Sequence, residues 1–175
     1  LEVNQFYILS DYLEERNDLQ LTVQLIDFQA GKQKELKTKV SAKANSSQIV
    51  KTLPLSEWMG EQDKANKMIH AILSNSKGDV ISTKDYFFYW PNKLNLPETK
   101  IETKMKYADG QYTLTLMSPK LAKDVFVEIP IQGAHFSDNF IDLLPGEKRT
   151  IVITSPLLKA ADRTPVTVKH IRQTY

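Results

Sequence analysis

A two-residue alternation of apolar and polar side chains is the sequence feature that most limits how this chain can fold. It is clearest at residues 19–25, where four apolar residues alternate with three polar ones. Successive side chains of a β-strand point to opposite faces, so this period predicts a strand with one buried and one hydrated face. Such segments recur about seven times in each half of the chain, a spacing typical of an antiparallel β-sandwich.

A turn at residues 144–147, Leu-Pro-Gly-Glu, separates two alternating segments near the C-terminus. Pro145 presets φ near −65° at the second turn position, and Gly146 accepts the positive φ that a type II turn needs next. After the turn, Ile151 and Ile153 fall on one strand face. The stretch predicts a corner of an antiparallel sandwich and carries no reaction chemistry.

Residues 91–97 form the best candidate for a domain boundary. Pro91 and Pro97 bracket the segment, and neither can extend a sheet ladder. The 175 residues are long enough for two sandwich domains of roughly 100 residues or slightly fewer each. We therefore expect an all-β protein of two immunoglobulin-like antiparallel β-sandwich domains in tandem, at residues 1–91 and 92–175, joined by a semi-rigid linker.

Composition excludes several classes of function. The net charge of +2 predicts no attraction to nucleic acid or to a membrane surface, and no apolar run approaches the ~20 residues of a membrane span. The absence of cysteine excludes disulfides and thiolate metal sites. His70, His135 and His170 lack the spacing of a zinc helix, so we expect no metal and no cofactor. A first residue that is Leu, with no leader after it, fits a fragment or a processed chain.

Two segments carry a resemblance to a known family. Residues 136–147, Phe-Ser-Asp-Asn-Phe-Ile-Asp-Leu-Leu-Pro-Gly-Glu, resemble the F-x-D-N-x-F-D-L-L-P-G-E signature near the C-terminus of β-mannosidases of glycoside hydrolase family 2. Ile141 replaces the aromatic residue common there. Residues 92–97, Asn-Lys-Leu-Asn-Leu-Pro, are similar to the linker before the last domain of these enzymes. The resemblance implies that the whole chain corresponds to their two C-terminal immunoglobulin-like domains, with the catalytic barrel before Leu1.

The resemblance also implies a role. Such an enzyme removes non-reducing β-mannose with two glutamates of the barrel, and the acid/base lies in an Asn-Glu pair. This chain has no Asn-Glu dipeptide, so we expect it to be non-catalytic and to buttress the barrel of a secreted, periplasmic or lysosomal parent. The alternative is an independent carbohydrate-binding or adhesion module. An uncovered apolar face would favour the buttress, and an aromatic platform in open solvent would favour the binder.

The aromatic run at residues 86–90 is the strongest candidate for a surface function. In a strand, Tyr86, Phe88 and Trp90 would share one face, and the other two aromatic residues would share the opposite face. Three roles remain open for this set: a contact with the other domain or with the barrel, a platform for an oligosaccharide, or a place in the core. Trp58 lies in an irregular stretch, where it would cover the end of the sandwich or touch sugar.

The signature near the C-terminus is expected to be structural. The short polar side chains of Asp138 and Asn139 suit hydrogen bonds to the backbone at a sheet corner, although they would also suit a face turned toward a catalytic domain. The residues assigned to this structural signature are Phe136, Asp138, Asn139, Phe140, Pro145 and Gly146.

Overall fold

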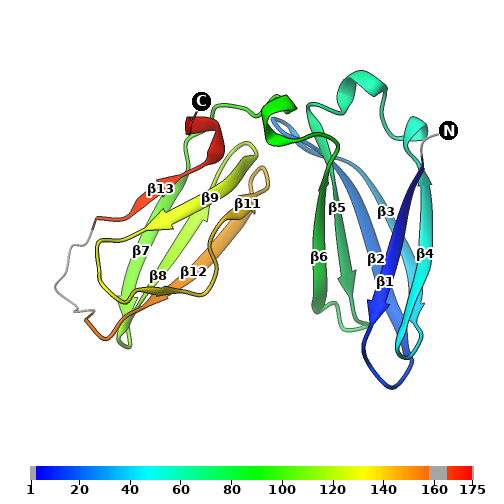
Figure 1. Cartoon of the computed structure of the whole chain (residues 1–175), viewed down its shortest axis with the longest axis horizontal. Helices are drawn as coiled ribbons and strands as arrows, with labels where there is room; N and C mark the ends of the chain where they lie inside the picture. Colours follow the sequence, from blue (N-terminus) through cyan, green and yellow to red (C-terminus); the bar gives the residue numbers. More distant parts are fainter. Residues whose placement is uncertain (1–2, 158–164, 175) are drawn as a thin grey trace. The chain divides into compact units, whose positions relative to one another are not determined.

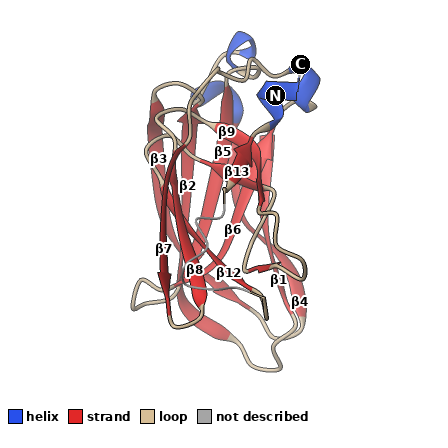
Figure 2. Ribbon diagram, turned by 90° about the vertical axis from the view of Figure 1, so that its left-hand side faces the viewer, coloured by secondary structure: helices blue, strands red, loops and turns tan. Residues whose placement is uncertain are grey.

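A computed structural model describes residues 3–157 and 165–174 of the chain (Figure 1). Its regular structure is β-strand apart from short 3-10 segments (Figure 2), which confirms the predicted all-β class. Contacts divide the chain into unit 1, Leu1–Asp27 with Lys32–Asn95, and unit 2, Phe28–Gly31 with Leu96–Tyr175. The domain boundary after residue 91 stays a prediction. In the described part of the chain, no helix has the length and hydrophobicity needed to cross a membrane.

Unit 1 consists of two antiparallel sheets. Strands β1 and β4 form a two-stranded sheet, and the other four strands form a sheet in the order β3-β2-β5-β6. The described residues of this unit thus contain six strands, one fewer than the spacing predicts. The elements are β1 (Val3–Ser10), β2 (Arg16–Asp27), β3 (Gly31–Ala42), β4 (Ser46–Pro54), η1 (Leu55–Glu57), η2 (Glu61–Asp63), β5 (Lys67–Ser74), β6 (Val80–Phe87) and η3 (Pro91–Lys93).

The core of unit 1 follows the predicted alternation. The four apolar residues that alternate along residues 19–25 are all buried, and β5 lies at the centre of its sheet between β2 and β6. Leu25 of β2 lies opposite Ile69 of β5, so both point to the same face. The main core cluster of this unit contains Leu21, Val23, Leu25, Leu53, Leu55, Met59 and Ile69.

Unit 2 is a second pair of antiparallel sheets. One has the order β10-β12-β8-β7 and the other β11-β9-β13. Its elements are β7 (Glu102–Ala108), β8 (Gln111–Met117), β9 (Ala122–Glu128), β10 (His135–Phe136), β11 (Ile141–Leu143), β12 (Lys148–Thr154), β13 (Thr167–Lys169) and η4 (Ile171–Thr174).

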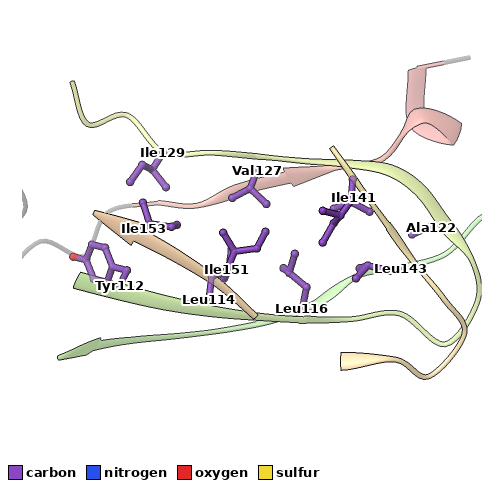
Figure 3. Packing of buried hydrophobic residues seen from close by; sticks show 11 residues of the cluster. Tyr112, Leu114, Leu116, Ala122, Val127, Ile129, Ile141, Leu143, Ile151 and Ile153 are labelled. Atoms are coloured by element: carbon purple, nitrogen blue, oxygen red, sulfur yellow. The ribbon is translucent and has the colours of Figure 1, made fainter. Parts of the chain in front are cut away.

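The core of unit 2 is built from the inward residues of both sheets (Figure 3). Ile151 and Ile153 of β12 are both buried in it, as the sequence predicts. Figure 3 shows Val127 of β9 and Leu114 of β8 on facing sides of this core. Alternate inward residues of two facing sheets form the single apolar layer of a β-sandwich.

The turn at residues 144–147 has the predicted form. Gly146 has a φ of 76°, and the Glu147 amide donates a 3.0 Å hydrogen bond to the Leu144 carbonyl. A positive φ at the third position with this closing bond is the pattern of a type II turn. The Gly146 amide also donates to the Ser118 carbonyl at 2.8 Å, which fixes the turn against the end of β8.

Candidate functional site

A groove of about 470 Å³ in unit 1 is the main candidate for a binding site. It lies between β1 and β6, which are edge strands of the two different sheets. Consecutive residues of both strands line its two sides, and side chains of β2 and β5 form its floor. Its volume is in the range of small-ligand sites, roughly 300–1,000 Å³.

The side of the groove formed by β6 is polar where a sandwich is normally apolar. Strand register places Ser82 opposite Leu73 and Lys84 opposite Ala71, so both β6 residues belong to the row that faces the core side. Both are exposed. Lys84 forms no ion pair with any residue that the structure describes. An edge strand therefore turns a hydroxyl and a cation into the groove.

Tyr86 completes this row at one end of the groove. It lies opposite Ile69 in the register and is half-exposed. Its ring meets Phe88 edge-on, with centroids 5.1 Å apart and an interplanar angle of 88°. Phe88 in turn packs against the core cluster of unit 1, so the Tyr86 ring is held by a partly buried neighbour.

Trp90 does not share a strand face with Tyr86, which corrects the prediction. Strand β6 ends at Phe87, and the chain bends at residues 88–89. Trp90 precedes Pro91 in extended conformation, φ −62° and ψ 153°, and is the N-cap of the 3-10 segment η3. The residue before a proline is restricted to such angles, and proline cannot continue the ladder. The Trp90 side chain is 79% exposed.

Trp58 follows η1 and packs partly buried against the core cluster of unit 1. Its amide donates to the Leu55 carbonyl at 2.8 Å, closing the 3-10 turn. It does not line the groove between β1 and β6. Contact of Trp58 or Trp90 with sugar or with another domain stays a prediction.

In unit 2, Asn139 of the signature binds the backbone. Its Oδ1 accepts from the Val127 amide at 2.8 Å, and its Nδ2 donates to the Val127 carbonyl at 2.9 Å. Among the described residues, Asp138 bonds only to the next one along the chain, since its Oδ1 accepts from the Asn139 amide at 2.9 Å. A contact of Asp138 or Asn139 with a catalytic domain stays a prediction.

Phe136 and Phe140 of the signature differ in exposure. Phe136 lies opposite Ile153 and packs against the core of unit 2. Phe140 is mostly exposed and has a φ of 56°, uncommon for a bulky residue. Its ring packs on Phe126 with centroids 5.0 Å apart, and its amide donates to Asn139 Oδ1 at 3.0 Å. The signature thus shapes a sheet corner.

A His-Asp pair joins β5 to β6, and no pattern in the sequence indicates it. His70 of β5 lies opposite Asp85 of β6, and its Nδ1 is 2.6 Å from Asp85 Oδ1. The His70 side chain is buried and that of Asp85 is partly buried. The pair lies on the sheet face opposite to the groove, because it alternates with the row of Lys84 and Tyr86. The contact links the neighbouring strands β5 and β6.

A small polar pocket in unit 2 surrounds the buried side chain of His170. Its Nε2 donates toward the Thr99 carbonyl at 3.3 Å, which leaves Nδ1 buried without a hydrogen-bond partner among the described residues. Burial lowers the pKa of His170 below its usual value, and the nearby Arg172 guanidinium lowers it further. The imidazole is therefore neutral at pH 7.

Two carboxylates of unit 1 are stabilised in their charged form. Hydrogen bonds from the side chains of Gln24 and Lys32 lower the pKa of Glu35 to about 2. A hydrogen bond from the Gly60 amide, together with Lys67, lowers the pKa of Asp63. Neither carboxylate lines the groove. No three His, Asp or Glu side chains within residues 3–157 and 165–174 are grouped so that they could hold a metal ion.

Comparison with known protein families identifies the chain. Residues 3–91 match the mannosidase Ig/CBM-like domain, which covers more than half of the chain. The chain belongs to this family. Residues 96–174 match the Ig-fold domain of mannosidases, so both halves are accessory domains of mannosidase type. The two β-sandwiches are thus immunoglobulin-like, as the resemblance implies.

Solved structures share the fold of this mannosidase Ig/CBM-like chain. A β-D-mannosidase from Dictyoglomus thermophilum matches with a TM-score of 0.68 and 23% identity, over 97% of this chain and 21% of that one. An exo-chitosanase from Amycolatopsis orientalis matches with a TM-score of 0.63 and 14% identity, over 95% of this chain and 24% of that one. The chain thus spans about a fifth to a quarter of these structures. No curated protein matches it.

Proposed function

We propose that this chain is the accessory part of a longer β-mannosidase and buttresses the catalytic domain of that enzyme. The observation that carries the proposal is the match of both halves to accessory domains of mannosidases. The similar structure from Dictyoglomus thermophilum is a β-D-mannosidase, and the matched region is 21% of its length. A catalytic domain in the same parent chain is the partner that this organisation supports.

An uncovered apolar patch on unit 1 supports the buttressing role. Tyr7 of β1 lies opposite Ile49 of β4, and both are about half-exposed on the outer face of the two-stranded sheet. Leu9 of β1 is 77% exposed and Leu13 of the following loop is 88% exposed. Soluble proteins rarely leave several large apolar side chains of one region in water unless another surface covers them. We assign this outer patch, Tyr7, Leu9, Leu13 and Ile49, to the contact with the catalytic domain.

The test uses the parent chain that contains these residues. It should hydrolyse 4-nitrophenyl β-D-mannopyranoside faster than the corresponding β-D-glucosaminide, the substrate class of the similar exo-chitosanase. The isolated 175-residue chain should hydrolyse neither. Preference of the parent for the glucosaminide, or turnover by the isolated chain, would contradict the proposal.

A pair of variants tests the buttress. Leu9→Ser with Leu13→Ser should lower the melting temperature of the parent's catalytic domain while leaving the melting of the isolated chain nearly unchanged, because both side chains are exposed in the chain alone. Thr52→Ala on β4, a small exposed residue, is the matched control and should change neither. Equal melting temperatures of the unchanged parent, the double Leu→Ser variant and the Thr52→Ala control would argue against the outer patch as the contact.

A further inference from the structure

We infer that the groove between β1 and β6 of unit 1 binds a linear neutral oligosaccharide of β-linked mannose, with Tyr86 as the platform for one sugar ring. The choice of mannose rests on the proposed function, whereas the location rests on the geometry of the groove alone. The site is distinct from the apolar patch assigned to the catalytic domain, although Tyr7 and Leu9 of β1 border both.

The groove offers both surfaces that a pyranose ring requires. A sugar ring has apolar C–H faces and a rim of hydroxyl groups. Phe6 and Ile8 of β1 supply an apolar wall, and Ile69, Ala71 and Leu73 of β5 supply an apolar floor. A groove that combines apolar walls with a few placed polar groups is the usual form of a small-ligand site.

The hydroxyl rim is met by polar groups on the opposite wall. Ser82 can donate or accept, and the Lys84 ammonium donates three hydrogen bonds without a competing ion pair in the described residues. These groups remain hydrated when the groove is empty, so their presence there does not destabilise the free protein.

Tyr86 is pre-organised for stacking. Its edge-on contact with Phe88 fixes the ring, and Phe88 is itself anchored in the core. Holding a contact ring in its bound orientation reduces the entropy lost on binding. An aromatic ring on the polar side of the groove places a stacking surface next to Lys84, two residues away on the same row.

A protein strand fits this groove less well than a sugar. A strand packed on the floor would bury the Lys84 ammonium, which is costly without a partner. An oligosaccharide leaves the ammonium hydrated.

The test is a titration of the 175-residue chain with β-1,4-mannohexaose, followed by two-dimensional amide NMR and calorimetry. We expect saturable shifts confined to β1, β5 and β6. Tyr86→Ala should weaken binding about tenfold, and Tyr86→Phe should keep it within about threefold because the ring remains. Lys84→Ala should weaken binding, and Trp90→Ala, an exposed aromatic outside the groove, should leave it unchanged.

Other outcomes separate the two proposals. Absence of shifts with mannohexaose, or equal loss on Tyr86→Ala and Trp90→Ala, would overturn this site and leave the parent's mannosidase activity untouched. Binding of mannohexaose by a chain whose parent lacks mannosidase activity would support the site and overturn the proposed function. If light scattering shows a dimer that Tyr86→Ala converts to monomer, a second copy fills the groove and the inference is wrong.

Discussion

Asn139 extends strand β11 with its side chain, by pairing both polar atoms of its amide with the backbone of Val127 in β9. The two bonds are 2.8 Å and 2.9 Å long. β11 itself pairs with β9 at Ile141 and Val125. A carboxamide has the same donor and acceptor as a peptide group, so it replaces a ladder residue where the chain turns away.

Asn139→Ala should therefore lower the stability of unit 2. The change leaves the amide and carbonyl of Val127 without partners next to a fully buried side chain, and an unpaired buried group costs about 1–3 kcal/mol. Asp138→Ala, which removes a single exposed bond, is the matched control and should cost less than about 1 kcal/mol. Urea unfolding followed by far-UV circular dichroism measures both, and equal losses would contradict the assigned role.

Gly146→Val should destabilise unit 2 by about 1–2 kcal/mol or slightly more. The φ of 76° is strained for any residue with a Cβ and more so for a β-branched one. No neighbouring atom lies within 4 Å of a Cβ placed there, so the cost comes from the backbone and not from a clash. Gly146→Asn should be milder, since Asn tolerates this conformation.

Pro145→Ala at the preceding turn position should cost less than about 1 kcal/mol, because it mainly increases the freedom of the unfolded chain. The order of the effects matters more than their size. Differential scanning calorimetry that finds Pro145→Ala severe and Gly146→Val silent would mean that the turn does not depend on the glycine.

Asp85→Ala should destabilise unit 1 by about 1–3 kcal/mol, because it removes the acceptor from the buried Nδ1 of His70. Asp85→Asn keeps a side-chain oxygen within reach of His70 Nδ1 and should destabilise the unit less than Asp85→Ala. Chemical unfolding of the three forms at pH 7 measures the difference. Equal stability of the Ala and Asn variants would show that the 2.6 Å contact contributes little.

The stability of unit 2 should decline as the pH falls below about 6.5. The folded state holds the pKa of His170 below its usual value, so below about pH 6.5 the unfolded chain binds a proton that the folded chain does not. The stabilising contribution of His170 is fully present at a pH above its pKa in the unfolded chain. It is lost as the pH falls toward its pKa in the folded chain. His170→Gln should flatten this dependence, measured as unfolding free energy between pH 7.5 and 5.

Arg172→Met is a finer test of the same group. Its guanidinium is the secondary cause of the lowered pKa, so its removal should reduce the decline without abolishing it. An unchanged pH dependence in both variants would place its origin elsewhere in unit 2.

Local patterns predicted much of this fold. The alternation at residues 19–25 identified a buried strand face, and the Pro145-Gly146 pair identified a turn with positive φ, because each depends on the geometry of a few consecutive residues. The family signature depended on residues 136–147, and the matches over both halves confirm the recognition.

The groove and the His70–Asp85 pair could not be predicted in this way. Both depend on which residues of β5 and β6 lie opposite each other, and the hairpin register shifts between Leu73 and Ser74. Such a shift changes the cross-strand partners without leaving a periodic signal. The sequence pattern alone therefore does not place Lys84 in a groove, and it does not reveal that the strand ends at Phe87, three residues before Trp90.

The positions of Trp58 and Trp90 have a practical consequence for spectroscopy. They are the only two tryptophans of the chain, and both belong to unit 1. One is partly buried against the core and the other is in water, so the emission spectrum combines a blue-shifted and a red-shifted component. Intrinsic tryptophan fluorescence will thus report the unfolding of unit 1, whereas unit 2 will unfold without a tryptophan signal of its own.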